Sequence, residues 1–187
     1  MARADREQVT ALINAHVAAV MPKVSVSVNT VLSQLERDPG EFIVDPWITE
    51  RRTLVAVQRS RVVAAAHLVR YGDGARSRCS AESYRGAAEI RWLLSSAASA
   101  VLAGFAAAGE ALVSACVGLL ADGRPTAVYG SGDLPAPGVY GVPEQWPPVR
   151  DIYLGAGFLP QGPIEVVSVA KVDSLLSLRG VRCDLKA

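Results

Sequence analysis

Two apolar runs separated by only two residues place the strongest constraint on how this chain can fold. Residues 53–58 (TLVAVQ) and 61–72 (RVVAAAHLVRYG) have strand-like composition, and only Arg59 and Ser60 lie between them. Two strands joined by so short a connection pair as an antiparallel hairpin, because a parallel pair needs a long crossover. The sequence therefore predicts a sheet that contains a hairpin near residue 60.

Helical and strand patterns alternate around this hairpin. Four segments have helical apolar spacing or a helix-capping pattern: 6–20, 27–40, 108–123 and about 146–156. Three further segments have strand patterns: 87–94, 125–130 and 164–172. Residues 41–50 fit either a connector or a short strand. This order predicts an α/β chain with a mixed, α+β type of sheet covered by helices.

Composition and charge exclude several classes of function. The 187 residues are 50% hydrophobic, which suits one globular domain. With 19 Lys and Arg against 18 Asp and Glu, the chain lacks the surplus of cations that a general nucleic-acid binder needs. The three cysteines, Cys79, Cys116 and Cys183, form no metal-binding pattern, so we expect no metal site.

The same considerations predict the compartment. Unpaired, widely spaced cysteines fit reduced thiols in a cytoplasm. The uncharged segment 92–109 is rich in Ser, Ala and Gly and is a poor membrane span, and the first ten residues carry charges of both signs, unlike a signal peptide. We therefore expect a cytoplasmic protein with neither a membrane nor a nucleic acid as its partner.

The segment VRDIYLGAGF (149–158) carries a resemblance to a known family. With the preceding order of hairpin, strand, helix and strand, it resembles the GNAT superfamily of acyl-CoA-dependent N-acetyltransferases over roughly residues 50–172. The longer run 134–158 resembles a bacterial, actinobacterial-like subgroup. The resemblance implies a central, mostly antiparallel sheet flanked by helices. It also implies a single GNAT-like domain at 1–172, with 173–187 as a tail or the start of an absent second half.

The resemblance assigns a catalytic role to Tyr153. In this family a tyrosine four residues before Gly-Phe gives a proton to the departing CoA thiolate. A phenol suits that step because its pKa of about 10 lies close to or above that of a thiol. The alternative is that Tyr153 simply packs under its helix. Gly157 and Phe158 are structural in either case, as the capping glycine and its hydrophobic contact.

The resemblance also implies acetyl-CoA as co-substrate, held partly by Gly109, Glu110 and Ala111. The family binds pyrophosphate on a Q/R-x-x-G-x-G/A turn at a helix N-terminus, where backbone N–H groups attract anions. Ala106 departs from this pattern, and Glu110 adds a negative charge. The segment between Leu94 and Gly109 is longer than usual. An ordinary Ala- and Gly-rich helix start is the alternative.

The strand 87–94 supplies the remaining expected site residues. By the same resemblance, Trp92, Leu93 and Leu94 line a cleft whose backbone groups pair with the pantetheine arm. Glu89 is the only acidic residue of this strand and the expected general base, directly or through water. Its alternative is an ordinary solvent-facing position. His67, a second possible base, fits better as a buried histidine.

These residues lead to two functional hypotheses. The first is an enzyme that transfers an acetyl group from acetyl-CoA to a primary amine on a small molecule or peptide. The second is a GNAT-like module that has lost catalysis and binds a ligand or a protein, with a homodimer as one arrangement. The departure at Ala106 motivates the second hypothesis, because a fold alone does not establish a function.

Overall fold

The computed structural model describes residues 3–36, 47–72, 84–95, 106–136, 139 and 141–162. The predicted strand 164–172, the tail 173–187 and the domain boundary between them lie outside these ranges. The predictions about them therefore stay predictions.

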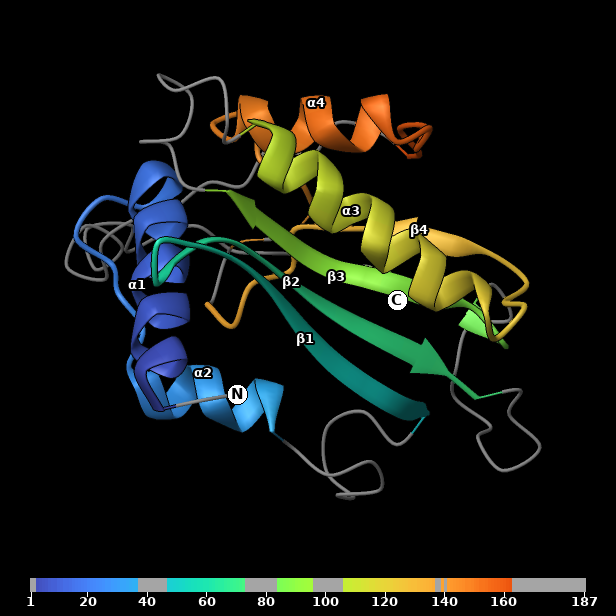
Figure 1. Cartoon of the computed structure of the whole chain (residues 1–187), viewed down its shortest axis with the longest axis horizontal. Coiled ribbons are helices and arrows are strands. Elements are labelled where there is room, and N and C mark those ends of the chain that lie inside the picture. Colours follow the sequence, from blue (N-terminus) through green and yellow to red (C-terminus); the bar gives the residue numbers. More distant parts are fainter. Residues whose placement is uncertain are drawn as a thin grey trace, which may run out of the picture.

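A four-stranded sheet forms the centre of the described structure (Figure 1). Its strands lie in the order β1 (Ile48–Gln58), β2 (Arg61–Tyr71), β3 (Ala88–Ser95) and β4 (Val128–Gly130). The first two pairings are antiparallel and the third is parallel. The prediction of a mixed, mostly antiparallel sheet is thus confirmed.

Two strand boundaries differ from the prediction. β1 begins at Ile48 instead of residue 53, because the polar residues 49–52 pair with the far end of β2 despite their weak strand pattern. β4 covers only Val128–Gly130 instead of 125–130. In both cases pairing with a neighbouring strand, and not local composition, sets the boundary.

The hairpin turn forms as predicted and is tied to the first helix. Arg59 and Ser60 have φ angles of 49° and 63°, which is the left-handed geometry of a two-residue hairpin turn. The Gln8 side chain accepts a hydrogen bond from the Val62 backbone N–H at 2.8 Å and donates to the Ser60 carbonyl at 3.4 Å. Neither turn residue is glycine, so this side chain helps to hold a conformation that costs energy.

Helices cover both faces of the sheet: α1 (Arg3–Val20), α2 (Val28–Leu35), α3 (Ala106–Ala121) and α4 (Pro147–Gly155). Side-chain contacts assign them to faces. The Arg70 guanidinium donates to the Leu119 carbonyl at 2.6 Å, so β2 presents Arg70 to α3. The Trp92 indole donates to the Gln34 side chain at 3.2 Å, so β3 presents Trp92 to α2 on the other face.

Two helix boundaries also differ from the prediction. α2 ends at Leu35, well before residue 40, and begins after an N-cap Ser27 whose hydroxyl accepts from the Thr30 N–H. α3 begins two residues early, at Ala106, and ends at Ala121. None of the helices in the described part of the chain is both long and apolar enough to cross a membrane.

Candidate functional site

β3 and β4 diverge after a short parallel contact. Their register runs from Ala88 opposite Val128 to Ile90 opposite Gly130 and no further within the described residues. Two more backbone bonds follow, from the Ser131 N–H to the Ile90 carbonyl and from the Asp133 N–H to the Arg91 carbonyl, both 2.9 Å. We call the place where this pairing ends, beyond Arg91 on β3 and beyond Asp133 on the chain after β4, the fork.

A β-bulge lies at the base of the fork. On β2, His67 and Leu68 are consecutive, but on β3 their partners are Trp92 and Ile90. Arg91 is therefore an extra residue in β3. A bulge bends its strand and increases the local twist. This places the bend of β3 where its contact with β4 ends.

The C-terminal end of α4 explains the spacing of Tyr153, Gly157 and Phe158. The Phe158 N–H bonds the Tyr153 carbonyl and the Gly157 N–H bonds the Leu154 carbonyl, both at 3.0 Å. This is the Schellman arrangement, and Gly157 has the left-handed φ of 88° that it requires. The Tyr153 and Phe158 rings complete it with an edge-to-face contact at 5.1 Å. The motif thus has a structural reason that is independent of chemistry.

The Tyr153 hydroxyl lies at the fork. It donates to the Ser131 carbonyl at 3.0 Å, and the Ile90 carbonyl lies 3.4 Å away. Its ring passes so close to Gly130 that a Cβ there would lie 2.8 Å from Cε1 of the ring. Gly130 was not predicted as a site residue, because its role depends on where α4 packs.

Burial controls the acidity of this hydroxyl. Desolvation raises the pKa of Tyr153 well above its usual value, and the Cys116 thiol and the Glu89 carboxylate add to the rise. Tyr153 is therefore a protonated donor at neutral pH.

Glu89 lies on β3 beside the fork but on the face opposite α3. Its partner on β2 is Val69, and it accepts a very short hydrogen bond from the Tyr71 hydroxyl. Only 8% of Glu89 is exposed, so the expected alternative of a solvent-facing strand residue is wrong. The strand end is covered by tyrosine rings that the strand pattern alone does not reveal. The carboxylate and the Tyr153 hydroxyl thus lie on opposite faces at one place in the sheet.

Trp92, Leu93 and Leu94 follow Glu89 along β3 and are fully buried. The Trp92 indole points toward α2 and stacks on the His67 ring at 5.6 Å. Contact between these residues and a pantetheine arm would therefore use their backbone groups. β2 pairs with one edge of this segment, and the other edge faces the fork.

The first turns of α3 contain the expected pyrophosphate residues. Gly109 is buried, and a Cβ there would lie 2.5 Å from Cδ1 of Ile152 on α4. The glycine therefore also serves the close packing of α3 on α4. Glu110 and Ala111 are exposed, so the carboxylate of Glu110 is directed toward solvent.

Two other residues have structural roles. Trp146 is buried: its indole donates to the His16 carbonyl at 3.1 Å and joins α4 to α1. His67 is fully buried, and its Nδ1 lies 3.0 Å from the Thr53 hydroxyl. Desolvation, with smaller contributions from Arg91 and Arg51, lowers the pKa of His67 to about 3. His67 is therefore a neutral core residue at physiological pH.

Comparison with solved structures identifies the fold of this chain. No protein-family model matches the sequence, and no curated protein matches it either. Three solved structures align with most of the chain at 14% identity each. An acetyltransferase of Trypanosoma brucei has a TM-score of 0.54 and covers 90% of this chain and 96% of its own. The fold is that of solved acetyltransferases.

Two further structures share this acetyltransferase fold. A transcriptional regulator from Bacillus halodurans has a TM-score of 0.55, with 90% of this chain and 96% of that chain covered. An aminoglycoside acetyltransferase from an uncultured soil metagenomic sample, solved in complex with sisomicin, has a TM-score of 0.53, with 91% and 93% covered. The resemblance to an actinobacterial-like subgroup stays a prediction. Within the described residues, no group of His, Cys, Asp or Glu is placed to hold a metal ion.

Proposed function

We propose that the protein transfers an acetyl group from acetyl-CoA to a primary amine by direct attack. The observation that carries this proposal is the pair of groups at the fork. Tyr153 places its hydroxyl there from the face covered by α3 and α4, and Glu89 places its carboxylate beside it from the other face. A proton donor and a proton acceptor on opposite faces of the sheet at one place suit a reaction that gives one proton and takes another.

The reaction balances with these two groups. An acceptor that arrives as an ammonium ion gives one proton to the Glu89 carboxylate, directly or through water. The neutral nitrogen attacks the thioester carbonyl carbon, the carbon–sulfur bond breaks, and the thiolate takes the Tyr153 proton. The second proton that the nitrogen loses restores Tyr153, and Glu89 releases its proton to water. The products are the amide, coenzyme A and one proton.

The acidity of Tyr153 fits this order of events. Because burial raises the pKa of Tyr153 above that of a thiol, proton transfer to the thiolate is uphill when taken alone. It becomes favourable when the tyrosinate recovers a proton from the attacking nitrogen. Until then the phenol acts chiefly as a hydrogen-bond donor to the developing thiolate charge.

The acetyl-CoA site rests on backbone groups more than on side chains. The edge of β3 beyond Arg91 makes no backbone hydrogen bond to the chain after β4 in the described residues, which suits an added extended ligand. Glu110 is exposed, and solvent screens the repulsion between its charge and a pyrophosphate more than it would for a buried carboxylate.

A second candidate function is a ligand-binding or protein-interaction module without catalysis. The contact between Gly109 and Ile152 favours it, because helix packing alone explains this glycine. The absence of a basic or amide side chain at Ala106 points in the same direction. Binding of acetyl-CoA without turnover would support this candidate.

The Tyr153→Phe variant tests the proposed function. It keeps the ring that packs on Phe158 and removes only the hydroxyl. We expect kcat for acetyl transfer to fall about 100-fold, within the range for loss of a general acid, while the Kd for acetyl-CoA changes little. Steady-state kinetics and calorimetric titration with acetyl-CoA measure the two quantities. An unchanged kcat would remove Tyr153 from the mechanism.

A further inference from the structure

Three tyrosines form a continuous group above Glu89. The ring centroids of Tyr71 and Tyr84 are 5.0 Å apart, and those of Tyr84 and Tyr129 are 5.5 Å apart. The rings are tilted by 60° and 52°, so they do not stack flat on one another. We call these three residues the aromatic row.

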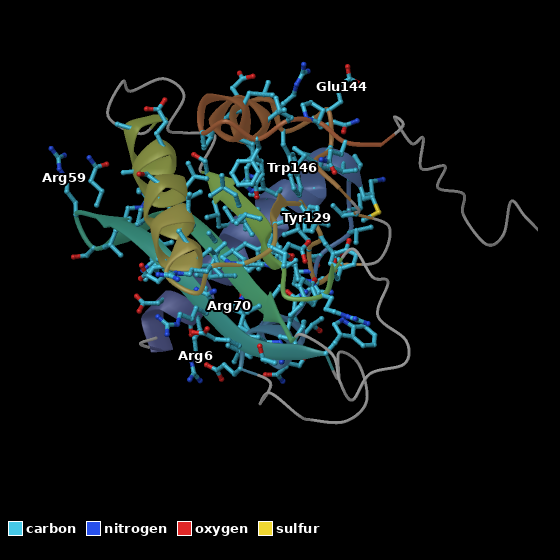
Figure 2. The ribbon with its side chains drawn as sticks, turned by 90° about the vertical axis from the view of Figure 1, so that its right-hand side faces the viewer. Arg6, Arg59, Arg70, Tyr129, Glu144 and Trp146 are labelled. Atoms are coloured by element: carbon cyan, nitrogen blue, oxygen red, sulfur yellow. The ribbon has the colours of Figure 1, made fainter. Side chains whose placement is uncertain are left out.

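The aromatic row is assembled from three separate parts of the fold. Tyr71 ends β2, Tyr84 lies in the turn before β3, and Tyr129 lies on β4 directly opposite Glu89 in the parallel register. The Tyr71 hydroxyl donates to the Glu89 carboxylate. Figure 2 shows Tyr129 below Trp146 and far from the hairpin turn at Arg59. The row therefore adjoins the fork and not the closed end of the hairpin.

Exposure rises from the carboxylate to the end of the row. Glu89 is 8% exposed, Tyr71 and Tyr129 are partly buried, and Tyr84 is 40% exposed. A molecule that approaches this face meets Tyr84 first and Glu89 last. Exposed tyrosine rings with a carboxylate beneath them form a surface suited to cations, because both the ring faces and the carboxylate carry negative potential.

The electrostatics of the row agree with this arrangement. Burial first, and then the charge of Glu89, raise the pKa of Tyr71 and also that of Tyr84. Tyr71 and Tyr84 therefore stay neutral phenols, and their negative neighbour is the carboxylate. Arg91 partly offsets this field, but its guanidinium is paired with Asp133 at 3.1 Å.

We propose that the aromatic row binds the acceptor as an alkylammonium ion and leads its nitrogen to Glu89 from the face opposite α3. The binding step stands on the row alone, and the delivery step rests on the proposed function. The ring faces hold the cation and its alkyl chain, and Glu89 then accepts one ammonium proton. The row thereby selects acceptors with an exposed aliphatic ammonium group over neutral molecules of the same shape.

A binding experiment without acetyl-CoA tests the first step. The probes are n-butylammonium chloride and its neutral counterpart n-butanol, each titrated into the full chain while NMR follows the tyrosine ring protons. We expect saturable shifts at Tyr84 and Tyr129 with butylammonium and an affinity at least about five-fold lower for butanol. Equal affinity for both probes, or shifts confined to other tyrosines, would overturn the proposal.

Two variants of Tyr84 separate the contribution of its ring to binding from that of its hydroxyl. Tyr84→Ala should weaken butylammonium binding about five-fold, whereas Tyr84→Phe, the matched control, should bind like the wild type because it keeps the ring face. Tyr84 is the most exposed member of the row, and Tyr84→Phe keeps its ring contacts with Tyr71 and Tyr129, which Tyr84→Ala removes. Equal binding by wild type and Tyr84→Ala would refute a role for the row.

A kinetic experiment separates this proposal from the proposed function. In acetyl transfer to butylamine, Tyr84→Ala should raise KM for the amine and leave KM for acetyl-CoA unchanged. An unchanged KM for the amine would overturn the row while leaving acetyl transfer intact. Selective butylammonium binding with no acetyl transfer by the wild type would sustain the row and reject the proposed function.

Discussion

At the scale of single residues, Tyr153 has two separable parts. Its ring packs on Phe158 as the hydrophobic contact of the helix end, and it fills the space above Gly130. Its hydroxyl reaches the Ser131 carbonyl at the fork. The sequence motif reports the first part directly. The proposed chemical role of the hydroxyl depends on where β3 and β4 lie, which the motif does not report.

His67 gives a residue-scale prediction about pH. Its pKa is about 3 in the folded chain and 6.5 when unperturbed, so the unfolded state binds more protons between these values. The neutral histidine thus supports the fold fully above pH 6.5, and this support is lost as pH falls. We expect the free energy of unfolding to drop by about 2 kcal/mol between pH 6.5 and 5, measured by urea denaturation.

The matched variant for this prediction is His67→Asn, which keeps a polar group near the Thr53 hydroxyl and removes the titrating ring. Its unfolding free energy should fall less steeply over the same pH range. His16, whose pKa is also lowered by burial, remains in the variant and leaves a residual slope. Parallel pH profiles for wild type and variant would contradict the assignment.

At the scale of elements, close contacts between α4 and its neighbours position the site. α4 approaches β4 at Gly130 and α3 at Gly109, and in each case a side chain of α4 occupies the space that a Cβ would take. Its capped C-terminal end then fixes the last turn. The position of Tyr153 thus depends on the absence of side chains elsewhere.

Gly130→Ala tests this dependence. The added Cβ would lie 2.8 Å from the Tyr153 ring and 3.2 Å from the Phe158 ring, so the Tyr153 ring must move. We expect a loss of about 1–3 kcal/mol in unfolding free energy, typical of overpacking. We also expect kcat for acetyl transfer to fall at least about ten-fold, since small displacements of positioned groups are costly. Gly155→Ala is the control, because no atom lies within 4 Å of its added Cβ.

Gly157→Ala tests the cap itself. The residue has a φ of 88°, which an L side chain rarely adopts, and nothing crowds its Cβ position. The expected cost of about 1 kcal/mol is therefore purely conformational. Chemical denaturation measures it. A neutral substitution would show that the last turn of α4 rearranges without cost.

Much of the element order could be predicted from the sequence, because it depends on local patterns. The hairpin follows from two strand runs around Arg59 and Ser60, and the end of α4 follows from Gly157. The geometry of the candidate site could be predicted less well. The bulge at Arg91 sets the direction of Trp92, and a register shift between strands leaves no local mark in the sequence.

The aromatic row illustrates the same limit. Its three tyrosines lie on or beside three different strands, and no spacing in the sequence connects them. The wrong expectation of an exposed Glu89 has the same origin. An acidic residue in an otherwise apolar strand fits a solvent-facing position until the rings that cover it are placed. Gly130 was missed because its neighbour in space comes from α4.

At the scale of the whole molecule, the sheet separates two faces, and Tyr153 and Glu89 approach the same part of the sheet from either side. α3 and α4 cover one face, and α1 and α2 cover the other (Figure 1). Trp146 connects the two layers by its bond to the His16 carbonyl. A ligand that occupies the fork should therefore stabilise both layers together.

Thermal unfolding with ligands tests this expectation. Acetyl-CoA and coenzyme A, each at about 100 times Kd, should raise the unfolding free energy by about 2.7 kcal/mol and Tm by about 5–10 °C for a chain of this length. A nucleotide control should have no such effect. No rise at millimolar acetyl-CoA would reject the acetyl-transfer proposal.

The capped end of α4 has a consequence for the history of such chains. Selection for folding alone would keep an aromatic ring at position 153, a glycine at 157 and an apolar residue at 158. The ring contact with Phe158 does not need the hydroxyl group of Tyr153, which adds one bond, to the Ser131 carbonyl. Among descendants of a common ancestor, exchange of Tyr for Phe at this position would therefore mark the branches on which catalysis was abandoned while the architecture survived.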